Sequence, residues 1–144
     1  MKRSGQTIGV FICLVLLCVT AIAGRAQTRM SDKDVEKMMN NLKEDAKKFR
    51  SSFDSAVGKS TIRKTDEEKR AKGLVEKFQK QTEQMLNQFK STTKADTSLP
   101  VVQDSANQID EILQKTPMGT EVSGHWEHVK AELATISGAF AAGH

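Results

Sequence analysis

Residues 122–140 read VSGHWEHVKAELATISGAF, and the large apolar side chains in this stretch recur at alternating steps of four and three positions. They are Val122, Trp126, Val129, Leu133, Ile136 and Phe140. This spacing places them on one face of an α-helix, as in helices that pack together in coiled coils and bundles. The stretch therefore predicts a closing helix at about 122–141 whose apolar face is buried against other helices.

Three earlier stretches repeat this spacing and carry signals for helix ends. Ser31 stands just before the first stretch as an N-cap, and Thr65 with Glu68 forms a capping box before the second. Ser98 is expected to cap the third stretch, and Pro117 is expected to end it. The four predicted helices cover about residues 32–57, 66–90, 99–115 and 122–141.

Four amphipathic helices joined by short loops predict an all-α fold, an up-down-up-down four-helix bundle. Residues 27–144 hold 28 apolar side chains larger than alanine, enough for one core without disulfides or metals. The connection between the first two helices, residues 59–72, has only Ile62 and Ala71 as apolar side chains. We therefore expect this tip to project beyond the shared core.

The N-terminal residues have the layout of a secretory signal peptide. Lys2 and Arg3 precede an apolar run over residues 8–23, and small residues follow it. The run is shorter than the roughly 20 residues that a permanent membrane-spanning helix needs. Residues 1–26 are therefore predicted to be a cleaved signal peptide, and residues 27–144 to be an exported helical bundle, periplasmic or secreted, with no transmembrane helix.

Two cleavage positions fit the small-x-small pattern, after Ala26 or after Ala23, and the first leaves a wholly polar mature N-terminus. Both cysteines, Cys13 and Cys18, lie inside the predicted signal peptide. The mature chain would then lack cysteine, which excludes disulfides, thiolate metal sites and cysteine nucleophiles.

Charge is distributed unevenly along the predicted mature chain. Cleavage would remove Lys2, Arg3 and Arg25 and lower the number of basic residues from 22 to 19, against 18 acidic ones, so no nucleic-acid partner is expected. Residues 27–94 hold 17 basic and 11 acidic residues, whereas residues 95–144 hold 2 and 7. The two halves should attract each other, either within one molecule or between copies.

The tip between the first two helices is the candidate binding surface, because basic side chains outnumber acidic ones there. The basic residues are Lys59, Arg63, Lys64, Lys69, Arg70 and Lys72. They could contact anionic phospholipid headgroups, cell-wall polymers or an acidic protein partner. Ile62 alone cannot insert usefully into a membrane, so such binding would be electrostatic and sensitive to salt.

His125 and His128 form the only local group that could share a metal ion. The apolar face of their helix leaves His125 at its flank and His128 on the solvent side, so the pair is a weak candidate and no functional metal site is predicted. Haem held by Met38 or Met39 and a histidine is also not expected, because His125 and His128 fall at the opposite end of an up-down-up-down bundle, and only the terminal His144 falls at the same end. No cofactor is predicted.

Motifs for catalysis are missing from the sequence. It has no G-x-S-x-G, H-E-x-x-H, G-x-G-x-x-G or P-loop motif, and no Glu-x-x-His pair of the kind that di-iron bundles use. We therefore expect no catalytic residues and no enzyme activity.

The pattern of the last three predicted helices resembles uncharacterised small secreted bacterial proteins that are α-helical and four-helix-bundle-like. The likeness covers residues 74–140. It rests on Phe78, Thr82, Leu86 and Phe89, on the pair Ile109-Asp110, and on the closing helix from Trp126 to Phe140. All of these positions except Asp110 lie on packing faces, so the resemblance implies the fold and export but no catalytic residues.

Taken together, these features predict an exported, non-enzymatic helical bundle with a binding or structural role in the cell envelope. One alternative is a small periplasmic chaperone or stress protein, whose Met- and Phe-containing N-terminal hairpin, punctuated by glycine, opens to bind clients. Another alternative is weak metal binding through His125 and His128.

Overall fold

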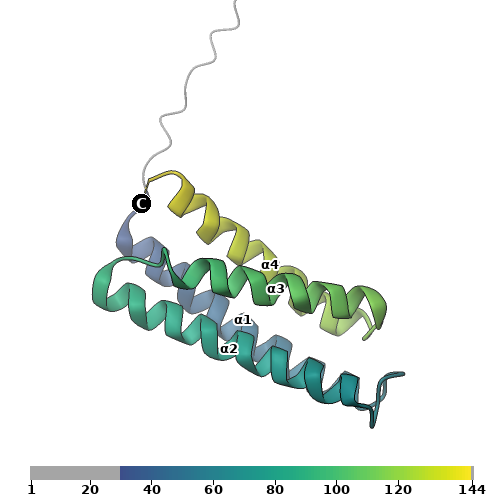
Figure 1. Cartoon of the computed structure of the whole chain (residues 1–144). Coiled ribbons are helices and arrows are strands. Elements are labelled where there is room, and N and C mark those ends of the chain that lie inside the picture. The colour runs from purple at the N-terminus through teal and green to yellow at the C-terminus, as the bar shows by residue number, and fades with distance from the viewer. Residues whose placement is uncertain (1–29, 144) are drawn as a thin grey trace, which may run out of the picture.

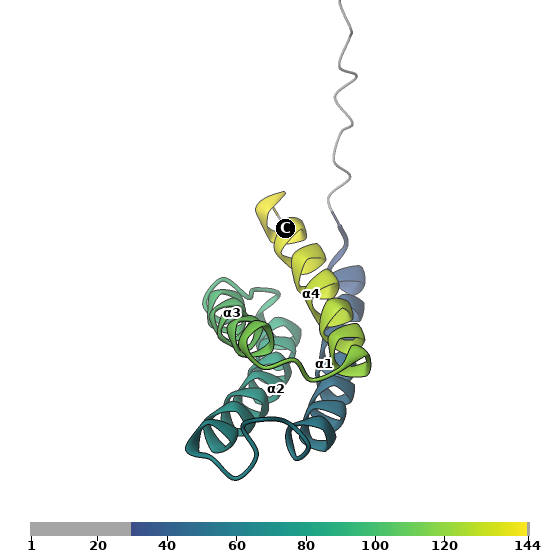
Figure 2. The same ribbon diagram turned by 90° about the vertical axis from the view of Figure 1, so that its right-hand side faces the viewer.

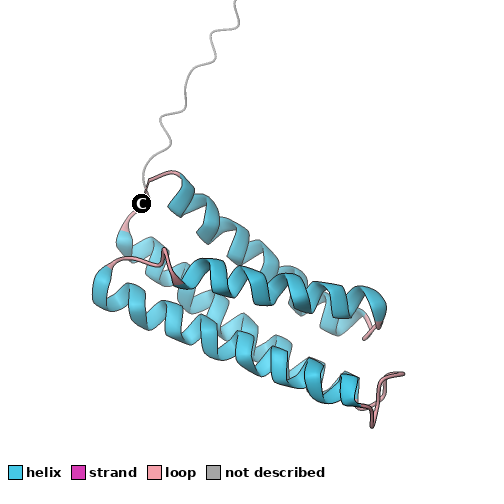
Figure 3. Ribbon diagram, viewed as in Figure 1, coloured by secondary structure: helices cyan, strands magenta, loops and turns pink. Residues whose placement is uncertain are grey.

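A computed structural model describes residues 30–143, which form four helices and no strand (Figure 3). The helices are α1 (Asp32–Val57), α2 (Asp66–Thr92), α3 (Ser98–Lys115) and α4 (Thr120–Ala141). The all-α, helical-bundle expectation is confirmed. The predicted signal peptide, its two cysteines and the terminal residue 144 lie outside the described part of the chain.

Successive helices run in alternating directions (Figure 1). α1 packs against both α2 and α4, and α2 packs against α3. α3 and α4 touch each other much less than the other neighbouring pairs do, and their ribbons are visibly separated in Figure 2. The bundle is therefore least closed along the α3–α4 side.

The apolar face predicted for the closing helix is buried, as its spacing requires. Trp126 is 2% exposed, and its ring centroid lies 4.7 Å from that of Phe49 on α1 and 5.7 Å from that of Phe78 on α2. Near the other end of α4, Phe140 meets Phe89 of α2 edge to face at 6.0 Å. Aromatic pairs at such distances add to the stability gained by burial alone, so they join α4 to the first two helices.

Two of the predicted caps form. The Ser31 side chain accepts a hydrogen bond from the backbone N–H of Asp34, and the Thr65 hydroxyl accepts one of 3.2 Å from the backbone N–H of Glu68. The Glu68 carboxylate, however, accepts from the backbone N–H of Lys64. The second helix thus has half of the expected capping box. Its glutamate accepts from the N–H of the residue before the N-cap and not from the N–H of the N-cap itself.

The start and end of the connection before α3 differ from the prediction. Ser98 is not the cap but the first residue of α3, and its hydroxyl donates to the Ala95 carbonyl. Ala95 is fully buried, which draws the loop inward and starts the helix early. α2 continues to Thr92 and ends at Thr93 in the left-handed conformation, with φ of 55°.

The expectation that the tip would project beyond the shared core is wrong. Ile62 is only 7% exposed and Ala71 is fully buried, and both belong to the same apolar core as the helix faces. Burial of these two side chains folds the loop back over the end of the α1–α2 pair. Ile62 therefore packs in the core and is not exposed at the tip.

Candidate functional site

The tip consists of the loop between α1 and α2 and the first turns of α2. Four backbone hydrogen bonds of 2.9–3.3 Å form successive turns through this loop. Their donors are the N–H groups of Lys59, Ser60, Arg63 and Thr65. Because the backbone polar groups are paired locally and Ile62 is buried, the loop has a defined backbone path, from which the charged side chains extend around the end of the bundle.

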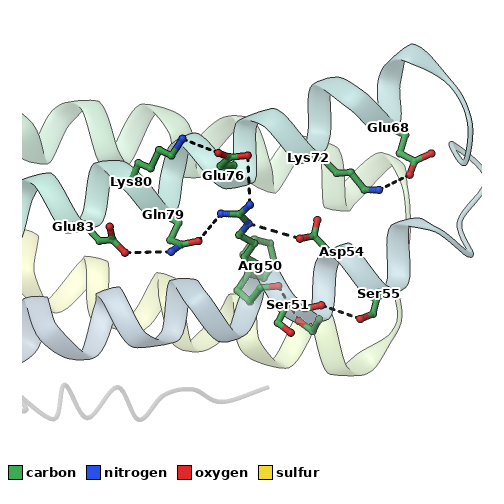
Figure 4. Close-up of polar contacts among 12 residues, drawn as sticks. Arg50, Ser51, Asp54, Ser55, Glu68, Lys72, Glu76, Gln79, Lys80 and Glu83 are labelled. Carbon is green, nitrogen blue, oxygen red and sulfur yellow. Dashed lines mark hydrogen bonds and ion pairs between the residues drawn. The ribbon is translucent and has the colours of Figure 1, made fainter.

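The six predicted basic residues fall into two groups. Lys69 pairs with Asp66 at 3.3 Å. Lys72 pairs with Glu68 at 2.8 Å, as Figure 4 shows. The other four are exposed and make no ion pair with any residue from 30 to 143. We call them the tip cations: Lys59, Arg63, Lys64 and Arg70. They are the part of the predicted surface that is left to meet an external anion.

The charge of Glu68 is held in place by its neighbours. The Lys72 ammonium and the backbone N–H of Lys64 keep the pKa of Glu68 below its usual range, and Glu68 in turn raises the pKa of Lys72. The pair is therefore fully ionised at neutral pH. Arg63 also lies near enough to Glu68 to contribute to the lowering of its pKa, although it makes no ion pair with it.

A hollow of about 370 Å³ adjoins the tip, between the end of α1 and the loop that enters α4. Lys59 lines it together with the hydroxyl-bearing Ser55, Ser60 and Thr120. Hydroxyl groups donate hydrogen bonds to anionic oxygens. The Ser55 and Ser60 hydroxyls, however, already donate to the backbone carbonyls of Ser51 and Val57, at 3.0 and 2.8 Å. Glu121 also lines the hollow. The hollow therefore adds no set of free donors to the positive charge of Lys59.

A network centred on Arg50 joins α1 to α2 beside the tip (Figure 4). Arg50 Nη1 donates to Gln79 Oε1 at 3.0 Å, Nη2 lies 3.4 Å from Glu76 Oε2, and Nε lies 3.7 Å from Asp54 Oδ2. Lys80, and then Arg50, hold the pKa of Glu76 below its usual range. Arg50 is thus neutralised, and it fixes the two helices that carry the tip.

The histidine pair occupies the positions that its helix face predicts. His125 is half-buried and His128 is exposed. Within residues 30–143, no group of three or more His, Cys, Asp or Glu side chains could hold a metal ion. The neighbouring Trp126 packs on Phe49, so the pair lies beside the second half of α1, far along the helix from Met39.

Neither the hollow beside the tip nor a second, larger one was predicted from the sequence. A groove of about 500 Å³ runs along the weakly packed α3–α4 side, with Ala106 and Leu133 among its apolar lining residues. Polar contacts bridge it: Gln103 donates to Ser137 Oγ at 2.7 Å, and Lys130 Nζ lies 3.4 Å from Asp110 Oδ1. The signal that could have indicated it was Asp110, the one position of the resemblance that does not lie on a packing face.

Comparison with known proteins finds no family model that matches the chain, and no curated protein or solved structure that matches it significantly. The resemblance to small secreted bacterial proteins therefore stays a prediction. Within the described residues, the helices lack any stretch long and apolar enough to cross a membrane.

Proposed function

We propose that this protein is an exported, non-enzymatic binding module of the cell envelope, and that its tip binds anionic groups there. The observation that carries the proposal is the set of tip cations, which are exposed and have no ion-pair partner among residues 30–143. Lys59, Arg63 and Lys64 sit on a loop whose own backbone is hydrogen-bonded and whose one large apolar side chain is buried, and Arg70 lies in the first turns of α2.

The expected strength of such binding is modest. A basic residue close to an anionic surface contributes about 1 kcal/mol, so four tip cations contribute about 4 kcal/mol, which corresponds to a Kd of about 1 mM. Burial of Ile62 removes any apolar contribution from the loop. Binding would therefore fall steeply as salt shortens the screening length.

The chaperone alternative has less support. Client binding needs an apolar face, and in the described part of the chain Val101 is the only large apolar side chain that is exposed. The N-terminal hairpin is closed by buried apolar residues and by the Arg50 network.

Vesicles containing phosphatidylglycerol and phosphatidylcholine in equal parts provide the first probe, and soluble polyphosphate the second. We expect the protein to co-sediment with these vesicles at low salt and not with vesicles of phosphatidylcholine alone. Binding to both probes would indicate recognition of phosphate groups in general, and binding to vesicles alone would indicate a membrane surface. If the protein bound neither the vesicles nor polyphosphate, the proposal would be overturned.

The tip variant replaces Lys59, Arg63 and Arg70 with Glu and should lose binding. Lys69 and Lys72 are left unchanged because acidic neighbours already pair with them, and Lys64 because its backbone is left-handed. The matched control replaces Lys33, Lys37 and Lys77, which are also exposed, with Glu. Equal loss in both variants would mean that only net charge matters and that the tip is not the site.

Export has its own test, the mass of the protein purified from the envelope fraction. A chain beginning at Gln27, or at Gly24 for the other cleavage position, is the expected result. A protein that retains residues 1–26 would contradict export with cleavage. Native mass spectrometry of the same sample also reports any retained metal, lipid or protein partner.

A further inference from the structure

Among the described residues, the basic residues of the first half of the chain do not form ion pairs with the acidic residues of the second half within the molecule. The ion pairs between residues 30 and 143 all join groups of the same half, such as Lys90 with Glu36 at 3.4 Å and Lys130 with Asp110 at 3.4 Å. The halves nevertheless pack closely, α1 on α4 and α2 on α3, through the shared apolar core. Intramolecular docking is thus apolar, and the complementary charges remain on the surface.

The outer face of α3 carries the acidic charge in an accessible form. α3 packs mainly on α2 alone, so much of its surface is uncovered. Asp104 and Glu111 are exposed and seven positions apart, which places them on the same helix face. Neither makes an ion pair with any residue in the described part of the chain. Val101, three positions before Asp104, is 48% exposed and lies on the same face.

The tip and this face match each other in charge and in chemistry. The tip offers cations without ion-pair partners, and the face offers carboxylates without ion-pair partners beside one exposed apolar side chain. The long apolar stem of an arginine can cover such a side chain while its guanidinium reaches a carboxylate. Each copy of the chain carries both surfaces, at different places on the molecule.

We infer that the tip of one copy binds the outer face of α3 of a second copy. This inference rests on the proposed function, because it uses the same tip cations and names a further anionic partner for them. The contact is heterologous, so each bound copy still offers a free tip or a free α3 face, and association continues head to tail. Pairs of exposed charges are individually weak, so assembly should require high local protein concentration and low salt.

Sedimentation velocity of the full processed protein tests the inference. We expect the average mass to rise with concentration at about 20 mM NaCl, and the dissociation constant to increase at least about tenfold at about 500 mM NaCl, where screening is much shorter. A protein that stays monomeric at low salt at every concentration would overturn the inference.

Charge reversal identifies the two surfaces. The tip variant described above and a face variant, Asp104→Lys with Glu111→Lys, should each remain monomeric alone. Mixed in equal amounts they should associate again, because the unmodified tip of the face variant fits the unmodified face of the tip variant, and the acidic tip of the latter fits the basic face of the former. The control Glu127→Lys with Glu132→Lys makes the same charge change on α4, away from the tip and the outer face of α3, and should associate like the unmodified protein. Failure of the mixture to associate would overturn the pairing, provided that circular dichroism shows both variants folded.

The two proposals fail separately. The face variant keeps its tip, so it should bind phosphatidylglycerol vesicles as the unmodified protein does. Tip-dependent vesicle binding by a protein that never self-associates would leave the proposed function standing and remove this inference. Self-association by a protein that binds neither anionic probe would support this inference and remove the proposed function. The tip would then serve assembly and not bind an anionic envelope ligand.

Discussion

The indole N–H of Trp126 donates a hydrogen bond of 3.0 Å to Oδ1 of Asp110, joining α4 to α3 across the side of the bundle where these helices touch least. Gln114 donates to the other carboxylate oxygen at 2.9 Å, and the Lys130 ammonium lies 3.4 Å from Oδ1. The buried tryptophan thus has its one polar atom satisfied by a carboxylate that is itself held by two more groups. Since Trp126 is the only tryptophan, its fluorescence reports directly on this contact.

Asp110→Asn should make the stability of the protein less dependent on acid pH. The Trp126 N–H, and then the Lys130 ammonium, hold the pKa of Asp110 below its usual range. A lowered pKa contributes stability that is fully present above the unfolded-state pKa of about 3.9 and is lost as pH falls through the folded-state pKa. We expect the unmodified protein to be more stable by about 1 kcal/mol at neutral pH, with the difference shrinking below about pH 4.

Urea unfolding followed by Trp126 fluorescence at a series of pH values measures this difference. The matched control is Asp104→Asn, an exposed carboxylate on the same helix, which should change the unfolding free energy by less than about 0.5 kcal/mol. A difference for Asp110→Asn that stays constant down to the most acid pH would contradict the assigned role of the charge.

Thr93→Gly should stabilise the protein. Thr93 ends α2 with φ of 55°, and its N–H donates to the Phe89 carbonyl at 2.7 Å. A β-branched residue is strained in this left-handed conformation, whereas glycine adopts it freely. We expect a gain of about 1 kcal/mol, seen as a rise in Tm of about 3–5 °C. Lys94→Gly, next in the chain and without a positive φ, should give no gain, and equal gains at both positions would argue against strain at Thr93.

Gln81→Met should also raise stability. Gln81 is 8% exposed, and its Oε1 is buried without a hydrogen-bond partner among residues 30–143. Burying a polar atom without a partner costs about 1–3 kcal/mol, and methionine has a similar shape without that atom. We expect a gain of about 1 kcal/mol in the free energy of unfolding by urea. Gln84→Met, an exposed position on the same helix, should change it little, and a destabilised Gln81→Met would indicate that the amide has a partner in solution.

Features that depend on local spacing could be predicted from the sequence. The predictions were wrong where the path of a loop depends on how the rest of the chain packs. The steps of four and three from Val122 to Phe140 determine a helix face by themselves, and the hydroxyl of Thr65 needs only the helix that follows it. Ile62 lies in a polar loop, so only the packed end of the α1–α2 pair explains its burial. Ala95 similarly draws in the loop that made Ser98 look like a cap.

The candidate site was predicted in composition but not in detail. Lys59, Arg63 and Lys64 lie in the loop between the first two helices, and Lys69, Arg70 and Lys72 lie in the first turns of α2. Which of them are neutralised depends on side-chain geometry: Lys69 and Lys72 meet Asp66 and Glu68 within one helical turn. Spacing predicts which residues share a helix face but not which helices pack together. It could therefore not show that, of the neighbouring helix pairs, α3 and α4 touch least.

Gly73→Ala distinguishes between two hypotheses, a rigid binding module and a chaperone whose α1–α2 hairpin opens. Gly73 is exposed in the interior of α2, and a Cβ added there would meet nothing within 4 Å. Alanine should therefore stabilise the helix by about 0.8–1 kcal/mol. A fixed tip needs no opening of the α1–α2 hairpin, so the variant should bind phosphatidylglycerol vesicles as tightly as the unmodified protein.

The same substitution at Gly138 of α4, which is also exposed and has open space around it, should give a similar gain without touching the hairpin. Aggregation of chemically reduced insulin provides the client assay. A chaperone that opens at the hairpin would suppress this aggregation and lose much of that effect in Gly73→Ala but not in Gly138→Ala, because stabilising α2 raises the cost of opening. We expect neither variant nor the unmodified protein to suppress it, since the apolar faces that clients need are buried in the core.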